Sequence, residues 1–181
     1  VDISGSTDIQ GQPVNVGTHN PLEDIKFVEE EFDLWFKQIL DREWPKLVKE
    51  IDQKRTKITD GITNRFTGLG ILESQVDTVL ISMSLKTKKP QDWSENDIMA
   101  FLKVLRKKAK PLLIAANKAD LCDNLEILEK ISDTFTVIPS SAETELLLKK
   151  ATKAKLIDYV PGDDNFTGKT DTQLSEQQNN A

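Results

Sequence analysis

The chain has 181 residues, of which 38% are hydrophobic and 30% charged, a composition typical of a polar, helix-rich globular protein with one domain or one domain plus an insertion. Its formal net charge of −6 excludes a surface that attracts nucleic acid everywhere, and its single cysteine, Cys122, excludes an intrachain disulfide, as expected in a reducing cytoplasm. No apolar run approaches the ~20 residues that a membrane-spanning helix needs, so no membrane partner is expected.

Residues 1–22 predict the end of a strand followed by a long loop. Val1-Asp2-Ile3 is typical of the last residues of a strand. Residues 4–22 are rich in Ser, Gly, Thr, Asn and Pro and show no periodicity. Because the chain starts with valine, and because a helix is expected to begin at Ser175 close to its end, we interpret the sequence as a piece of a longer protein.

Residues 23–57 carry two apolar stripes with helical spacing. The first stripe begins after Asp24 and contains Ile25, Val28, Phe32, Trp35, Phe36, Ile39 and Leu40. The second contains Trp44, Leu47, Val48 and Ile51, and it predicts another helix that continues to Lys57, with Pro45 in its first turn. We expect the three tryptophans, Trp35, Trp44 and Trp93, to lie in the core.

Two further helices are predicted before the pattern changes. The first follows a turn at 67–70 and carries Val76, Val79, Leu80 and Met83, and a basic loop at 86–90 follows it. Ser94 with Asp97 forms a capping box that starts the second. That helix buries Ile98, Phe101, Leu102 and Leu105, and it ends in Arg106-Lys107-Lys108, where cations suit the helix dipole.

The remainder alternates between strands and helices. The apolar run 111–116 predicts a strand buried on both faces in a parallel sheet. A helix with Leu125, Leu128 and Ile131 follows, then a strand at 135–138, a helix from Ser141, and a polar, mobile tail from Pro161. This order indicates an α/β fold interrupted by an all-helical insertion. We expect four segments: 1–22, the insertion 23–94, the second α/β part 95–166 and a linker 167–181.

The motif Asn117-Lys118-Ala119-Asp120 directly follows the first predicted internal strand, where ligands bind in open parallel sheets. The carboxylate of Asp120 can accept two hydrogen bonds from N1–H and the exocyclic amine of guanine, which adenine does not offer in that geometry. The stem of Lys118 can cover the base while its ammonium stays in water, and Asn117 can bridge the base edge and neighbouring loops. The alternative is a chance turn made of ordinary turn and cap residues.

A second element follows the next strand. Ser140, Ser141 and Ala142 stand where GTPases place a Ser-Ala pair, whose alanine N–H reaches guanine O6. Simple N-capping by Ser140 or Ser141 is the alternative, and both roles are compatible because a cap residue orients the same N–H groups. The order strand, Asn-Lys-x-Asp, helix, strand, Ser-Ala, helix favours guanine binding more strongly than either motif alone.

Three segments resemble the Obg/YchF group of translation-associated GTPases, in its archaeal and fungal-type branch. They are Ser4–Asp8, Gly17–Ile25 and Leu156–Asp163, and the resemblance runs over about residues 1–166. It implies the C-terminal half of a Ras-like P-loop GTPase domain with a helical insertion, in a cytoplasmic, ribosome-associated protein with a P-loop upstream and a TGS domain downstream. It also implies GTP or GDP as ligand, with Mg²⁺ in the intact protein.

No catalytic residue or metal ligand is assigned, and this chain is expected to bind guanine nucleotide only weakly by itself. The segment Asp2-Ile3-Ser4-Gly5 has the pattern of the magnesium-linked Asp-x-x-Gly motif. In this family, however, the segment corresponds to the end of a later strand, so we do not assign it to a metal. The segment 162–170 imitates a P-loop but has five residues between its glycines instead of four. His19 is expected to hold local loop contacts. The alternative functions are a helical module that docks on the ribosome or its RNA, and a GTPase-like scaffold without nucleotide.

Overall fold

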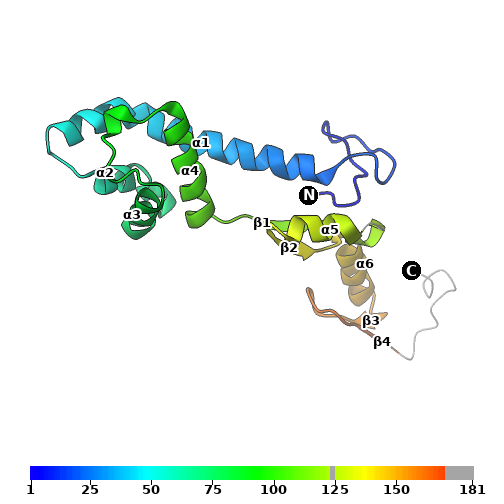
Figure 1. Cartoon of the computed structure of the whole chain (residues 1–181). Coiled ribbons are helices and arrows are strands. Elements are labelled where there is room, and N and C mark those ends of the chain that lie inside the picture. The colour runs from blue at the N-terminus through cyan, green and yellow to red at the C-terminus, as the bar shows by residue number, and fades with distance from the viewer. Residues whose placement is uncertain (123–124, 170–181) are drawn as a thin grey trace. The chain divides into compact units, whose positions relative to one another are not determined.

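The computed structural model describes residues 1–122 and 125–169. The chain forms two compact units: Leu22–Leu112, and Val1–Pro21 together with Leu113–Ala181 (Figure 1). The helix start expected at Ser175 and residues 170–181 of the expected linker lie outside the described residues. Among the described residues, no helix combines the length and the apolar character needed to cross a membrane.

The helical unit is formed by α1 (Pro21–Asp52), α2 (Ile58–Arg65), α3 (Glu73–Ser82) and α4 (Glu95–Ala109). The prediction of two helices in the range of α1 was wrong, because Pro45 lies inside one continuous helix. Pro45 has no N–H to donate to the carbonyl of Asp41, but Leu40 and Leu47 on either side of it are both fully buried in the same core. The helix also ends before Lys57, because Lys54 has a left-handed φ of 55°.

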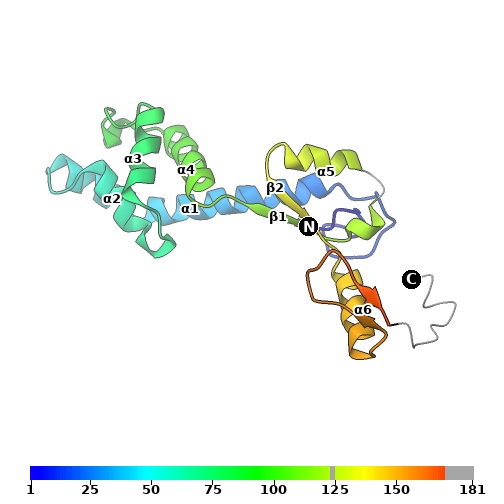
Figure 2. The ribbon, with the colours of Figure 1, turned by 90° about the horizontal axis from the view of Figure 1, so that it is seen from below.

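One hydrophobic core holds the four helices together. The helix α3 packs against both α2 and α4 (Figure 2). Its aromatic centre contains a stacked Phe36–Phe66 pair, with ring centroids 5.3 Å apart, and Trp93 between Trp44 and Phe101. Trp93 is buried and Trp44 half-buried, as predicted, but the prediction for Trp35 was wrong, since 44% of it is exposed.

The helix α2 has no counterpart among the predicted elements. Its sequence, Ile-Thr-Asp-Gly-Ile-Thr-Asn-Arg, is rich in residues with low helix propensity. It forms because Ile62 is fully buried and because Gly61 lies against Leu47, whose Cδ1 would be 2.2 Å from any added Cβ. Packing therefore overrides local propensity here.

The helices α3 and α4 agree with the sequence. The capping box of α4 is confirmed: Ser94 Oγ accepts a hydrogen bond from the Asp97 N–H at 3.1 Å, and Asp97 Oδ2 accepts one from the Ser94 N–H at 2.7 Å. Arg106, predicted only as a cation that suits the dipole of α4, is 1% exposed. Its Nε donates to Asp33 at 2.9 Å and its Nη2 to Glu29 at 2.7 Å, so two carboxylates of α1 neutralise it.

The α/β unit contains a parallel pair of strands, β1 (Leu113–Ala116) and β2 (Thr136–Pro139), with Ile114 opposite Val137. Figure 2 shows α5 (Leu125–Ser132) beside β2, and α6 (Ala142–Lys153) follows β2. The parallel pairing was predicted correctly, but the prediction that β1 is buried on both faces was wrong. Ile114 and Ala116 are buried, whereas Leu113 is 57% exposed and Ala115 is also exposed.

The N-terminal residues extend this sheet, as the sequence predicts. Asp2 forms a parallel bridge with Asn117, and the N–H of Ile3 donates to the carbonyl of Asn117 at 2.9 Å. The N–H of Asn117 in turn donates to the carbonyl of Val1 at 2.8 Å. The first three residues therefore lie beside the end of β1.

A small hairpin lies near the end of the described chain. The strand β3 (Ile157–Asp158) pairs antiparallel with β4 (Thr167–Gly168). Residues 167–168 are thus part of the α/β unit, where the sequence predicted a linker and a mobile tail. The same pairing places Gly168 of the P-loop-like segment in a strand instead of a phosphate-binding turn; Thr170 of that segment lies outside the described residues.

The boundary between the two units also differs from the expected one. The sequence placed it at 94/95, whereas α4 packs on α3 and the helical unit continues to Leu112. The change from helical to alternating pattern at residue 111 coincides with this boundary.

Candidate functional site

The motif residues 117–120 lie where β1 ends, at the carboxyl edge of the parallel strands. In open α/β sheets this edge is where ligands bind. The next loop, residues 140–142, leaves the carboxyl end of β2, so the two predicted elements lie at the same edge.

Three hydrogen bonds join the two loops. The side-chain Oδ1 of Asn117 accepts from the Ala142 N–H at 2.9 Å, and the Ala119 N–H donates to the Ser140 carbonyl at 3.1 Å. The Ser140 N–H donates to the carbonyl of Ala116 at 2.9 Å. The structure therefore brings together the two loops that the sequence predicted to share one ligand, with Asn117 and Ala142 in direct contact.

Ser141 has the cap role that the sequence allowed. Its Oγ accepts a hydrogen bond from the Thr144 N–H at 3.1 Å and so orients the first turn of α6. The N–H of Ala142 was expected to be aimed at a ligand. In the structure it donates to Asn117 instead.

The ammonium of Lys118 makes contacts that the sequence did not predict. Its backbone is left-handed, with φ 61°, and its ammonium was expected to stay in water. Instead, Nζ donates to Asp2 Oδ2 at 2.9 Å, to Ser6 Oγ at 2.8 Å and to Thr7 Oγ1 at 3.0 Å. The loop after the first strand therefore holds the lysine head in place.

Asp2 is the centre of this network, a role that was not predicted from the sequence. Partial burial alone would raise the pKa of Asp2, but hydrogen bonds from Lys118, Ser4, Thr7 and Ser6 outweigh it and hold the pKa well below its ordinary value. The carboxylate is thus charged at neutral pH. The available signal was an aspartate followed by hydroxyl residues at positions 4, 6 and 7, directly after a strand end.

Asp120 lies in a short 3₁₀ turn, Ala119–Leu121, and its residue is exposed. Within residues 1–122 and 125–169, its carboxylate makes no hydrogen bond or ion pair. A carboxylate that is exposed and not engaged by neighbouring side chains is available to a ligand at the sheet edge.

His19 and Cys122 each have a contact within the α/β unit. The N–H of His19 donates to the carbonyl of Gly5 at 3.1 Å, and the Sγ of Cys122, which is half-buried, approaches the carbonyl of Ile3 at 3.7 Å. Over the described part of the chain, no group of three or more His, Cys, Asp or Glu side chains is arranged to hold a metal ion.

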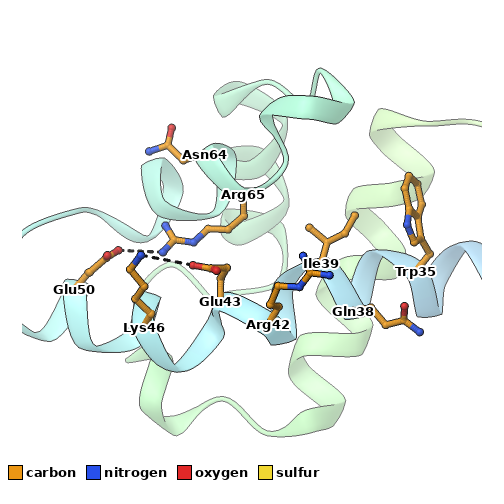
Figure 3. A pocket seen from close by; sticks show the side chains of 9 residues that line it. All are labelled: Trp35, Gln38, Ile39, Arg42, Glu43, Lys46, Glu50, Asn64 and Arg65. Atoms are coloured by element: carbon orange, nitrogen blue, oxygen red, sulfur yellow. Dashed lines mark hydrogen bonds and ion pairs between the residues drawn. The ribbon is translucent and has the colours of Figure 1, made fainter.

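A separate hollow of about 520 Å³ lies on the helical unit, between α1 and α2 (Figure 3). Trp35, Arg42 and Arg65 are among the residues that line it. Arg65 is paired with Glu50 at 3.1 Å. The hollow contains none of the predicted site residues, so it is not the site formed by the two loops.

The chain is similar to known proteins. Residues 115–181 match the family described as "Obg-like GTPase YGR210-like, G4 motif-containing domain". Over 184 residues the chain is 38% identical to the "Uncharacterized GTP-binding protein MJ1332" of Methanocaldococcus jannaschii, and the alignment covers 100% of this chain and 45% of that protein.

A solved structure gives the same result. The crystal structure of a GTP-binding protein from Pyrococcus horikoshii OT3 superposes with a TM-score of 0.76 at 38% identity, covering 89% of this chain and 47% of that chain. The chain therefore spans about half the length of the relatives that it matches. The chain has an α/β fold and is similar to proteins described as GTP-binding, and its residues 115–181 match the G4 motif-containing domain of Obg-like GTPases.

Proposed function

We propose that the loops 117–120 and 140–142 recognise the guanine base of GTP and GDP. The observation that carries this proposal is the 2.9 Å hydrogen bond from the Ala142 N–H to Asn117 Oδ1, which joins the two loops at one sheet edge. Because this hydrogen bond holds the two loops together, both loops can contact the same planar base. Similarity to proteins named as GTP-binding supports the same ligand.

Asp120 selects guanine over adenine in this proposal. Its exposed carboxylate accepts hydrogen bonds from N1–H and the exocyclic amine of guanine. Hydrogen bonds to a charged acceptor are roughly twice as strong as neutral ones, and adenine presents an acceptor at N1 instead of a donor. Discrimination therefore comes both from the pair formed with guanine and from the unpaired carboxylate left beside adenine.

Asn117, Ala142 and Lys118 complete the base site. Because Asn117 Oδ1 faces Ala142, the amide nitrogen of Asn117 is the group that turns to the base edge. The Ala142 N–H is shared between Asn117 and guanine O6, as three-centre hydrogen bonds commonly are at helix termini. The positive end of the α6 dipole favours that electronegative oxygen, and Ser141 orients the turn. The stem of Lys118 covers one face of the base.

The native protein, in this proposal, is a GTP-hydrolysing member of the YchF-type branch, with Mg²⁺ at the phosphates. A role on the ribosome is proposed from the family resemblance. The described residues offer a base site and no assigned catalytic group, so we propose that the 181-residue chain alone binds guanine nucleotides weakly and does not hydrolyse them.

The test exchanges the base-reading carboxylate for an amide in the native protein. Asp120→Asn should weaken GTP binding and improve binding of xanthosine triphosphate, because the amide can donate to the 2-carbonyl that replaces the amine. Titration calorimetry with both nucleotides measures the ratio of affinities. Asp133→Asn, at another exposed aspartate of the same unit, is the matched control. A preference for GTP that survives Asp120→Asn would remove Asp120 from the site.

A second candidate function is docking of a partner on the helical unit. It is favoured by the hollow between α1 and α2, whose wall carries the exposed Trp35 and Arg42. Co-sedimentation of the Trp35→Ala/Arg42→Ala variant with ribosomes tests this candidate, with Lys26→Ala on the exposed start of α1 as control. Unchanged co-sedimentation of the double variant would contradict docking through this hollow.

A further inference from the structure

The ammonium of Lys118 uses all of its hydrogen-bonding capacity inside the protein. A lysine ammonium has three N–H donors, and Lys118 Nζ has three oxygen partners at 2.8–3.0 Å: Asp2, Ser6 and Thr7. The same carboxylate of Asp2 accepts from Ser6 Oγ at 2.9 Å and from Thr7 Oγ1 at 2.7 Å. The four side chains therefore form a closed network.

Asp2 is also tied to the motif through the backbone. It forms the parallel bridge with Asn117, next to Lys118, and the other carboxylate oxygen of Asp2 accepts from Ser4 Oγ at 2.7 Å. Lys118 itself has a φ of 61°, a conformation that few residues other than glycine adopt without support. The aspartate thus holds the lysine head while the strand pairing holds the backbone of its neighbour.

We propose that Asp2 is a positioning residue of the nucleotide site, which fixes the methylene stem of Lys118 as a rigid platform for the base. This inference rests on the proposed function. A fully bonded ammonium cannot turn to a phosphate or ribose oxygen without giving up one of its partners. What Lys118 presents to a ligand is therefore its apolar stem, and ordering that stem in advance lowers the entropic cost of binding.

The test is a double-mutant cycle on GDP affinity in the native protein. Asp2→Ala should weaken binding on the order of tenfold, because the ammonium loses its anchor and the stem becomes mobile. In a Lys118→Met background, which keeps an unbranched stem without the ammonium, Asp2→Ala should change affinity less than about twofold. A general disruption of the loop by Asp2→Ala would lower affinity equally in both backgrounds, and that result would overturn the proposal.

Asp8→Ala is the matched control in the same loop. Asp8 Oδ1 accepts from the N–H groups of Gln10 and Gln12, at 2.9 and 2.8 Å, whereas the three partners of Lys118 Nζ are Asp2, Ser6 and Thr7. It should therefore give the same fold-change in both backgrounds. Unchanged GDP affinity in Asp2→Ala alone would also contradict the positioning role.

A measurement without nucleotide separates this inference from the base-recognition proposal. Three hydrogen bonds slow the exchange of the Lys118 ammonium protons with water, so its ¹⁵N NMR signal should be observed in the wild type and lost in Asp2→Ala. Retention of the signal in Asp2→Ala would overturn the anchoring of Lys118, whatever nucleotide binds. Failure of Asp120→Asn to shift base preference would overturn the role of Asp120 and leave the Asp2–Lys118 cycle intact.

Discussion

Asn117 and Ala142 lie 25 positions apart in the chain and are joined by a hydrogen bond of 2.9 Å between Oδ1 of the first and the backbone N–H of the second. The donor belongs to the first turn of α6, and the acceptor follows the last residue of β1. One side chain thus sets the distance between the two loops. Loss of this hydrogen bond should therefore lower the affinity for a ligand that contacts both loops more than it lowers the stability of the fold.

Asn117→Ala should therefore reduce guanine-nucleotide affinity more than stability. Removing the acceptor leaves the Ala142 N–H exposed to water, so the free energy of unfolding should fall by only about 1 kcal/mol. GDP affinity, measured by titration calorimetry, should fall at least about tenfold, which corresponds to ~1.4 kcal/mol. Asn64→Ala, at an exposed position of α2, is the control and should change neither. A normal affinity in Asn117→Ala would separate this contact from ligand binding.

Gly5→Ala should destabilise the α/β unit. Gly5 has a φ of +61°, and an added Cβ would lie 2.2 Å from the backbone oxygen of His19, which cannot move without breaking the loop. We expect a loss on the order of 3 kcal/mol in chemical denaturation.

Gly11→Ala separates the cost of the left-handed backbone from the cost of the clash with His19. Gly11 has a φ of +78°, but no atom lies within 4 Å of the added Cβ. It should cost about 1 kcal/mol, the cost of the left-handed backbone alone. Equal losses at Gly5 and Gly11 would show that the close approach to His19 is unimportant.

Arg106→Ala should destabilise the helical unit strongly. Removing the guanidinium leaves the buried carboxylate of Asp33 without its cation, and breaking such a buried pair costs about 3–5 kcal/mol. Lys108→Ala, at an exposed position on the same helix, should change the free energy of unfolding by less than about 0.5 kcal/mol. Arg106→Ala with wild-type stability would mean that the pair is not formed in solution.

The helical unit should also lose stability in acid through Asp97. Hydrogen bonds from Lys88 and from the side chain and backbone of Ser94 lower the pKa of Asp97 from its ordinary 3.8 to about 2. Because the folded pKa lies below the unfolded one, the contribution is fully present above pH 3.8 and is lost as the pH falls towards 2. Denaturation at several pH values should show this fall, and Asp97→Asn should flatten it. A wild-type profile as flat as that of the variant would contradict the lowered pKa.

Much of the fold could be predicted from local signals. The capping box at Ser94, the stripe of α3 and the Ser141 cap depend on residues within a few positions of each other, and all three were found as predicted. The parallel pairing of β1 and β2 followed from the alternation of strands and helices.

The incorrect predictions share a physical cause, because each depends on contacts between segments that are distant in the sequence. Pro45 is tolerated in α1 because buried leucines flank it, and α2 forms because Gly61 fits against Leu47. Arg106 was predicted to interact with the dipole of its own helix, although its partners lie more than 70 positions away in α1. For the candidate site, the residue types and their sheet edge were predictable, but the anchoring of Lys118 by Asp2 was not, since 116 positions separate them.

The distribution of aromatic residues allows the two units to be observed separately. All three tryptophans lie in the helical unit, two of them, Trp44 and Trp93, in its core, whereas Tyr159, the only tyrosine of the sequence, lies in the α/β unit. Indole emission therefore reports the melting of one unit without contribution from the other. Paired with a far-ultraviolet signal from the whole chain, it shows in a single titration whether the units unfold together or in sequence.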